Sequence, residues 1–197
     1  METETRSMDN LADLLDPPGF RDPSKPHVTD LIYAADAIGS GKEIVPFDYD
    51  ALPEYSRNIM SMGRIWEHLV GADVIRESCL LGMVPIMKPV MEVDGILGSV
   101  DGALYPVDRL TQAEVVVEIK ARFSPPKPDF PMGNTKYMRQ CKAYCHMTGA
   151  RKVWMPILYF NTRPPNAQYL IHRFEFTDLE VEENWQMILN IRDFLNK

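Results

Sequence analysis

Three side chains with metal-binding and acid–base chemistry stand close together in the middle of the sequence. Asp101 ends one apolar run, and Glu118 and Lys120 directly follow another, Val115-Val116-Val117. Alternate residues of a β-strand point to the same face, so Glu118 and Lys120 are expected to share one face of a sheet. Two carboxylates and an amine that converge at a sheet edge can hold a divalent cation and a water molecule beside a phosphate group.

The apolar runs on either side of these residues predict the strands that position them. An unbroken run of β-branched residues indicates a strand buried on both faces, and we expect a central strand over 113–121. A β-hairpin is expected over 90–104, with a tight turn at Asp94-Gly95. The segment 85–89 begins and ends with proline, and we expect it to form part of the rim.

A long helix is expected over 56–80, because apolar residues recur there at helical spacing. Gly63, Glu67 and Gly71 lie four residues apart and therefore form one line along this helix. Glycine inside a helix costs about 1 kcal/mol relative to alanine, so the pair predicts that another backbone passes close to Glu67. Glycines also flank Asp101, where we expect them to leave room for a ligand. The alternative for Glu67 is a surface carboxylate on a tolerant helix.

A second helix is expected to begin at Asn134 or Thr135, either of which can cap it, and to end before Gly149. One of its faces carries three side chains at intervals of four, namely Lys136, Gln140 and Tyr144. Two strands, over 152–160 and 168–176, follow with a turn at Thr162–Asn166 between them. A capping-box pattern then starts the terminal helix at Thr177.

The resulting order is helix, three strands, helix, two strands and helix, which predicts a mixed α/β fold. Residues 1–54 are expected to form an acidic, proline-containing arm with short helices, and residues 55–197 the folded core. One short helix is expected around Leu11–Leu15 and another over 30–38, capped by Thr29. The arm can cover a groove or a partner surface, or be disordered.

The distribution of charge says more than its total. The net charge is −7, which argues against a nucleic-acid partner. Residues 119–152, however, hold eight basic side chains against one acidic residue, and a local basic patch matters more for phosphate binding. A solvated basic helix face is the alternative explanation.

The rest of the composition is typical of a cytoplasmic protein. The amino-terminal stretch is polar and acidic, and no apolar run approaches the length of a membrane span, so we expect no membrane association. The three cysteines lack the spacing of a disulfide framework and are expected to be reduced core thiols.

In order and in element context, these residues resemble the PD-(D/E)XK nuclease superfamily. Asp101 matches its first acidic residue and Glu118-Ile119-Lys120 its E-x-K motif, although the usual proline before the acidic residue is Val100 here. Gly63–Glu67 resembles the G-x-x-x-E of an upstream helix. Gln140–Tyr144 resembles the Q-x-x-x-Y typical of RecB-type nuclease domains, lambda-type phage exonucleases and CRISPR adaptation nucleases.

The resemblance implies a restriction-endonuclease-like core, in which helices flank a central mixed sheet of about five strands. It implies catalytic roles for Lys120, Asp101 and Glu118. It also implies an Mg²⁺ or Mn²⁺ ion held by Glu67, Asp101, Glu118 and the backbone carbonyl of Ile119. The implied nucleic-acid contacts are Gln140, Tyr144, Lys136, Arg139 and Lys142. Relatives with an iron–sulfur cluster need four cysteines, so we expect no such cluster.

The function expected from the resemblance is metal-dependent hydrolysis of DNA phosphodiester bonds. The preferred form is an exonuclease in phage or mobile-element recombination or DNA end processing, with a single-strand annealing protein as a possible partner. A single-strand or structure-specific endonuclease of the same fold is the alternative. Two further hypotheses remain. One is a catalytically inactive DNA-binding or scaffold protein, and the other is a non-nuclease α/β domain in which the motifs arise by chance.

Overall fold

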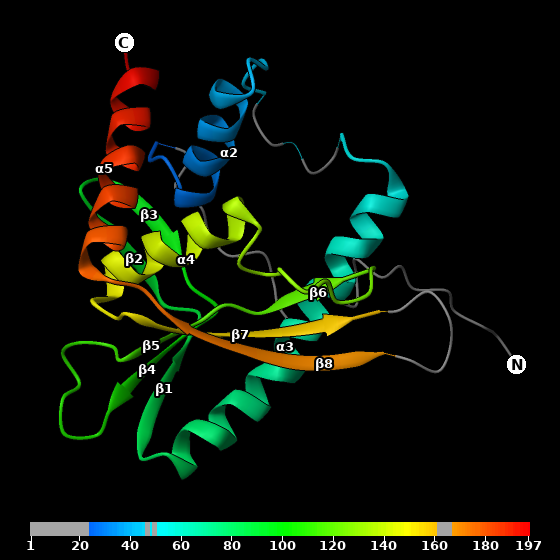
Figure 1. The fold of residues 1–197 in the computed structure, drawn as a ribbon, viewed down its shortest axis with the longest axis vertical. Helices are drawn as coiled ribbons and strands as arrows, with labels where there is room; N and C mark the ends of the chain where they lie inside the picture. Colours follow the sequence, from blue (N-terminus) through cyan, green and yellow to red (C-terminus); the bar gives the residue numbers. More distant parts are fainter. Residues whose placement is uncertain (1–23, 46–47, 49–50, 161–166) are drawn as a thin grey trace, which may run out of the picture.

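The computed structural model describes residues 24–45, 48, 51–160 and 167–197 (Figure 1). The helix expected around Leu11–Leu15 and the turn expected at Thr162–Asn166 lie outside these residues. In the described part the elements are α2 (Val28–Gly39), α3 (Glu54–Leu80), β1 (Met83–Met87), β2 (Val90–Val93), β3 (Ile96–Ser99), β4 (Gly102–Pro106), β5 (Val115–Val117), β6 (Lys120–Arg122), α4 (Thr135–Thr148), β7 (Lys152–Tyr159), β8 (Gln168–Glu175) and α5 (Asp178–Leu195).

A mixed sheet forms the centre of the described structure. Strand β4 is antiparallel to β1 and β5, β7 is parallel to β5, and β8 is antiparallel to β7. Val115 lies opposite Lys152 and Lys120 opposite Ile157, which is the same register, so β6 continues β5 along one edge of β7. The expected α/β class, with a central mixed sheet flanked by helices, is confirmed.

The uninterrupted strand expected over 113–121 is wrong, because its regular pairing stops at Val117 and resumes at Lys120. The chain stays aligned with β7 through this gap, since the Glu118 N–H donates to the carbonyl of Trp154 at 3.0 Å. On its other side, β5 pairs with β4 only as far as Val117 opposite Gly102. Within the described residues, no strand pairing joins these two segments beyond that pair, while β6 continues along β7. The sheet therefore divides at Glu118, and we call this point the fork.

The rim segment expected over 85–89 is also wrong, because its first three residues belong to strand β1. Pro85 lies opposite Leu104 of β4 in this antiparallel pair. Proline has no N–H to donate, so it is confined to positions such as the edge of a sheet. Strand β1 is an edge of the sheet, which explains why it tolerates a proline.

The hairpin expected over 90–104 forms only over β2 and β3, which make a separate two-stranded sheet. Asp94 and Gly95 occupy its turn with φ values of 52° and 74°. Positive φ at both positions is the requirement of a type I′ turn, which suits Asp-Gly. The chain then leaves this hairpin, passes Asp101 and enters the main sheet as β4.

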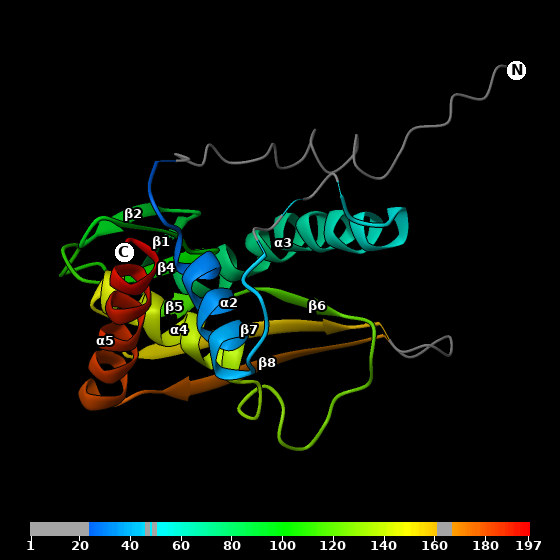
Figure 2. The same ribbon diagram turned by 90° about the horizontal axis from the view of Figure 1, so that it is seen from above.

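Helix α3 packs against one face of the sheet, apart from the other helices (Figures 1 and 2). Val70 and Val74 are its buried apolar contacts, whereas Leu69, one of the apolar residues at helical spacing, is 59% exposed. Among the described residues, no backbone packs against the two glycines, Gly63 and Gly71, that predicted one close to Glu67. A Cβ on Gly63 would meet nothing within 4 Å, and one on Gly71 would meet only the side chain of Met87.

Helices α2, α4 and α5 cover the opposite face and share the larger core. Helix α2 lies in the segment 1–54, which was expected to form an amino-terminal arm. Its residues Val28, Leu31 and Ile32 are nevertheless almost completely buried in this core. Burying each such side chain stabilises the fold by roughly 1.5–3 kcal/mol, so α2 is an integral part of the fold. Among the described residues, no helix combines the length and apolarity needed to span a bilayer.

The helix ends follow from local side-chain chemistry. His27, and not Thr29 as expected, caps α2, because its Nδ1 accepts a hydrogen bond from the Thr29 N–H at 3.3 Å. Asn134, one of the two residues predicted to be able to cap α4, is its cap, and its side chain accepts from the Tyr137 N–H at 3.2 Å. Gly149 ends α4 in the left-handed conformation. The predicted capping box at the start of α5 is present.

Candidate active site

The fork of the sheet places two carboxylates beside each other. The last β4–β5 pair is Gly102 opposite Val117. Next to it, Asp101 Oδ2 accepts a hydrogen bond from the Ile119 N–H at 2.7 Å. A side-chain oxygen thus takes the place that a strand carbonyl would occupy in a continued ladder. This contact ties Asp101 to the residue between Glu118 and Lys120, so the three side chains predicted to meet do lie together.

Glu118 points toward the helix α4 side of the sheet, because its neighbours Val117 and Ile119 face α3. The side chain is almost completely buried, and its Oε1 forms an ion pair with Lys120 Nζ, as their spacing predicts. The other oxygen, Oε2, has no hydrogen-bond partner in the described structure. A buried acceptor without a donor costs about 1–3 kcal/mol, which makes this atom a candidate for a bound cation or ligand.

Helix α3 brings a third carboxylate, Glu67, to the same place. Burial, together with the negative charge of Asp101, raises the pKa of Glu67 to about 8. Burial likewise raises the pKa of Glu118 to about 7, although Lys120 opposes the change. Lys88 is a partner that the sequence did not indicate, with its Nζ 3.9 Å from Glu67 Oε2. These mutual effects show that the carboxylates share one electrostatic environment.

Lys120 lies between the carboxylates and an aromatic side chain of α4. Burial lowers the pKa of its ammonium, but Glu118 and Asp101 outweigh burial and hold it above the usual value. Its Nζ also lies 5.4 Å from the ring centroid of Tyr137, within range of a cation–π contact. The lysine is therefore fixed from two sides.

The donor set fits a hard divalent cation, although its side chains are not gathered around one point. In the described part of the chain, no three acidic, histidine or cysteine side chains stand close enough to hold an ion. One oxygen of Glu118 is paired with Lys120, and one of Asp101 accepts from Ile119. The other Glu118 oxygen is buried without a donor. Carboxylate oxygens are the ligands that Mg²⁺ and Mn²⁺ prefer, so these residues suit such an ion. Its binding would require Lys120 Nζ to move away from Glu118 Oε1.

Helix α4 presents the predicted Gln140–Tyr144 pair, but the two residues are placed differently. Gln140 is half-buried, and its Nε2 donates to the Tyr144 hydroxyl at 3.1 Å. Tyr144 is 1% exposed and packs against Gly98. Gly98 is one of the two glycines near Asp101 that were expected to leave room for a ligand. It leaves room for the side chains of Tyr144 and Met147 instead. A side chain buried this deeply cannot touch a bound strand directly, so in this structure Tyr144 orients Gln140.

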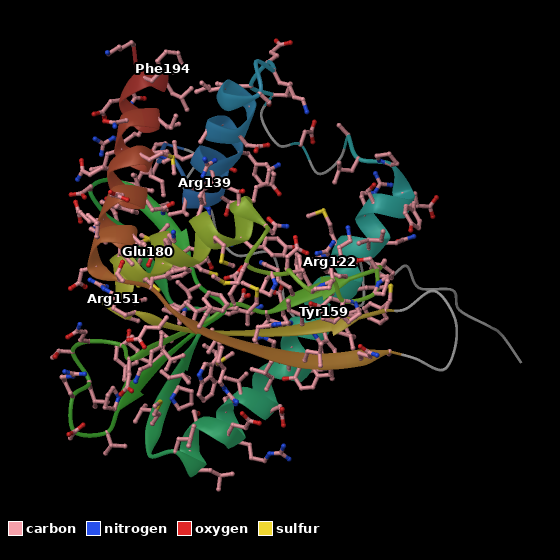
Figure 3. The ribbon with its side chains drawn as sticks, in the orientation of Figure 1. Arg122, Arg139, Arg151, Tyr159, Glu180 and Phe194 are labelled. Atoms are coloured by element: carbon pink, nitrogen blue, oxygen red, sulfur yellow. The ribbon has the colours of Figure 1, made fainter. Side chains whose placement is uncertain are left out.

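The basic residues of segment 119–152 do not form one patch. Besides Lys120, four of them are paired with acidic residues of other elements. These ion pairs are Lys136–Asp36 (3.0 Å), Lys142–Glu180 (3.5 Å), Arg151–Asp178 (2.6 Å) and Lys152–Glu114 (2.7 Å). Figure 3 shows Arg122, Arg139 and Arg151 in separate regions of the molecule. Lys142 faces α5, on the side of α4 away from Gln140, and does not share a surface with the predicted site.

A pocket that the sequence did not identify lies beside this site, between α2, the segment after β6 and the start of α4. Its volume is about 420 Å³. The basic side chains that line it are Arg122, Lys127 and Lys136. The signal that could have identified it is the sequence after the E-x-K motif, where two more basic residues and Phe130 follow.

Comparisons with known proteins agree with this fold. No family model and no curated protein matches the sequence. The alkaline exonuclease LHK-Exo from Laribacter hongkongensis superposes with a TM-score of 0.53 and 15% identity, over 87% of this chain and 88% of that one. Its complex with dAMP gives the same values. A phage-related exonuclease from Haemophilus somnus 129PT has a TM-score of 0.45 and 11% identity, over 85% and 81% of the chains. At such low identity the likeness to LHK-Exo shows only that the two proteins share a fold.

Proposed function

We propose that this chain is a Mg²⁺- or Mn²⁺-dependent deoxyribonuclease, and that it acts as an exonuclease. The observation that carries the proposal is the meeting of Asp101, Glu118 and Lys120 at the fork of the sheet. A buried carboxylate oxygen without a donor lies at the same point. The shared fold with LHK-Exo supports the same reaction class.

The metal would be held by oxygen atoms at the fork, supplied by Glu67, Asp101, Glu118 and the Ile119 carbonyl. When bound, it would polarise a phosphate oxygen and lower the pKa of a water molecule. Lys120 orients that water or offsets the negative charge that builds on the phosphate. Asp101 contributes through one oxygen while the other keeps the Ile119 backbone in place.

The strand of DNA would run along the start of α4, past the fork. Gln140 contacts the strand next to the scissile phosphate, and Tyr144 holds its amide in position. Lys136 and Arg139 contribute phosphate contacts, which weaken as salt rises. Lys142 is engaged with Glu180, so we assign it a structural role.

An exonuclease is preferred over an endonuclease because of the Q-x-x-x-Y motif and the exonuclease fold. A role in phage or mobile-element recombination, together with a single-strand annealing protein, is the biological context that we propose. The endonuclease alternative differs in one respect that can be measured, because an exonuclease needs a free end.

The test is digestion of end-labelled linear DNA and of circular single-stranded DNA, with Mg²⁺, with Mn²⁺ and with EDTA. The expected result is metal-dependent loss of the linear substrates only. Lys120→Ala is expected to lower the rate by about 10²–10³-fold, because it removes a charge that stabilises the transition state. Asp101→Asn is expected to abolish cleavage.

Lys42→Ala, which removes an exposed lysine outside the site, serves as the matched control and should cut like wild type. The site assignment is wrong if Lys120→Ala cuts as fast as this control. Cleavage of the circular substrate would instead favour the endonuclease.

A further inference from the structure

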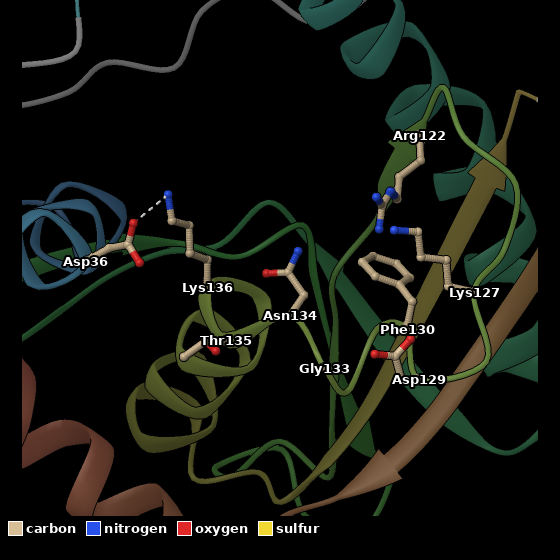
Figure 4. Close-up of a pocket in the computed structure, with 9 residues that line it drawn as sticks. All are labelled: Asp36, Arg122, Lys127, Asp129, Phe130, Gly133, Asn134, Thr135 and Lys136. Atoms are coloured by element: carbon tan, nitrogen blue, oxygen red, sulfur yellow. Dashed lines mark ion pairs between the residues drawn. The ribbon is translucent and has the colours of Figure 1, made fainter. Parts of the chain in front are cut away.

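The pocket beside the candidate active site carries charges of both signs (Figure 4). Arg122, Lys127 and Asp129 stand on one side of it, and Lys136 and Asp36 on the other. The start of α4 forms part of the wall, and the first turn of this helix holds no acidic residue. Because the amino end of a helix carries a partial positive charge, this wall is electrostatically suited to a negatively charged group.

Lys136 is held by helix α2 on its side of the pocket. Its Nζ lies 3.0 Å from Asp36 Oδ2, and both side chains are more than a third exposed. The same ammonium lies 4.6 Å from the ring centroid of Tyr33, also on α2. An exposed pair of this kind contributes only about 0–1 kcal/mol, so a stronger anion can displace the carboxylate.

The opposite side of the pocket also has a carboxylate, Asp129, but in the described structure it forms no ion pair with the basic side chains there. The guanidinium carbon of Arg122 lies 3.8 Å from the centroid of the Phe130 ring, which fixes the plane of the group. In the described structure, neither Arg122 nor Lys127 forms an ion pair. Of the three basic residues that line the pocket, Lys136 therefore differs in having an internal carboxylate partner.

We propose that Asp36 competes with a phosphate group of the DNA for Lys136 and thereby sets the affinity of this pocket. This inference rests on the proposed function. A phosphate that binds the Lys136 ammonium does so against the charge of Asp36, whose Oδ2 lies 3.0 Å from Nζ. Asp36 thus lowers the affinity of this pocket for phosphate groups.

The test is a double-mutant cycle on DNA binding, measured by fluorescence anisotropy of a labelled oligonucleotide in EDTA so that no cleavage occurs. Asp36→Asn keeps the side-chain shape and removes its charge. It is expected to tighten binding about two- to fivefold, which corresponds to the energy of an exposed ion pair. The slope of log K against log salt should also steepen, by up to about 0.9, because one more lysine is free to neutralise a phosphate.

Two further variants separate competition from simple repulsion. Glu183→Gln removes one exposed negative charge from α5, which is not part of the pocket, and should change affinity less than Asp36→Asn. In a Lys136→Met background, the gain from Asp36→Asn should shrink, because no ammonium remains to be released. Thermal unfolding of each variant checks that the fold is unchanged.

The inference is overturned if Asp36→Asn binds DNA no more tightly than Glu183→Gln, or if its gain is the same with and without Lys136. If that happens while the wild-type chain cuts DNA, the proposed function stands and only the role of Asp36 fails. If the wild-type chain neither binds nor cuts DNA, the proposed function fails and this inference fails with it.

Discussion

Glu118 combines an irregular position in the sheet with an unusual electrostatic environment. It sits in the gap between β5 and β6, is 1% exposed, and has one oxygen paired with Lys120 and the other without a donor. Such an arrangement is unfavourable for stability alone, because a buried unpaired acceptor and a raised pKa both cost free energy. Arrangements of this kind concentrate at functional sites, where a ligand completes them.

A metal-binding measurement tests this arrangement independently of cleavage. Wild-type protein is expected to bind Mn²⁺ in isothermal titration calorimetry, and Asp101→Asn to weaken binding by at least about tenfold. Asparagine can still accept from the Ile119 N–H, so the backbone should remain in place while a charged ligand is lost. Asp108→Asn, in an exposed loop, is the control. Equal Mn²⁺ affinity in the two variants would contradict the proposed ligand set.

At the scale of elements, helix α4 matters most because it carries Gln140 and forms one wall of the pocket. Its two ends are fixed by the Asn134 cap and by Gly149, whose φ is 77°. Its interior is fixed by Tyr144, which packs against the β2–β3 hairpin at Gly98. The orientation of Gln140 at the fork therefore depends on both ends of the helix and on a second sheet.

Gly149→Ala is expected to lower the free energy of unfolding by about 1–2 kcal/mol. A side chain is strained at positive φ, and the new Cβ would lie 2.9 Å from Gln112 Cγ. Gly63→Ala is the contrasting control, because it lies inside α3 with nothing within 4 Å and should gain about 0.5–1 kcal/mol. Urea unfolding measures both. Changes of the same sign in the two variants would show that the left-handed cap is not the reason for Gly149.

The contact between α4 and α5 predicts a pH dependence of stability. His146 stacks on Trp185 at 4.4 Å between ring centroids, and burial lowers its pKa although Glu182 and Asp94 oppose this. The unfolded chain then binds more protons than the native state below about pH 6.5, so this residue's contribution to stability falls as pH falls.

His146→Phe keeps a stacking ring and removes the titration. Its free energy of unfolding should therefore fall less than that of wild type between pH 7.5 and pH 5.5, as measured by urea unfolding. An identical fall in both proteins would show that His146 does not contribute to the pH dependence.

At the scale of the whole molecule, charge is distributed unevenly along the chain. The first 23 residues hold six acidic and two basic side chains, whereas the described core begins with Lys25, paired with Glu92, and with the buried helix α2. The chain thus carries much of its negative charge outside the described core. Charge of this kind opposes the approach of a polyanion at low salt.

A chain that starts at Ser24 lacks the six acidic and two basic side chains of the first 23 residues, a net charge of −4. It should bind DNA more tightly than the full chain at low salt. The difference in DNA affinity should vanish near 1 M salt, because the Debye length there is only about 3 Å and more distant charges are screened. Equal DNA affinity of the two chains at low salt would contradict this prediction.

Local patterns in the sequence predicted most elements because local physics fixes them. The type I′ turn at Asp94-Gly95, the Asn134 cap and the Gly149 stop each depend on a few neighbouring residues. The fork was missed because residues 113–121 contain no glycine or proline, and nothing within the segment marks where β4 leaves. Strand β1 was missed because Pro85 argues against a strand unless its edge position is known.

The sequence by itself determined which groups are available for chemistry and in what order strands and helices carry them. The spacing of Glu118 and Lys120 already implied that they would meet, because strand periodicity is a property of the backbone. Only the tertiary structure decided which charges remain available. Lys136, Lys142 and Arg151 look alike in the sequence, but each is paired with a carboxylate from a distant element. Such pairing depends on how elements pack, which no local pattern encodes.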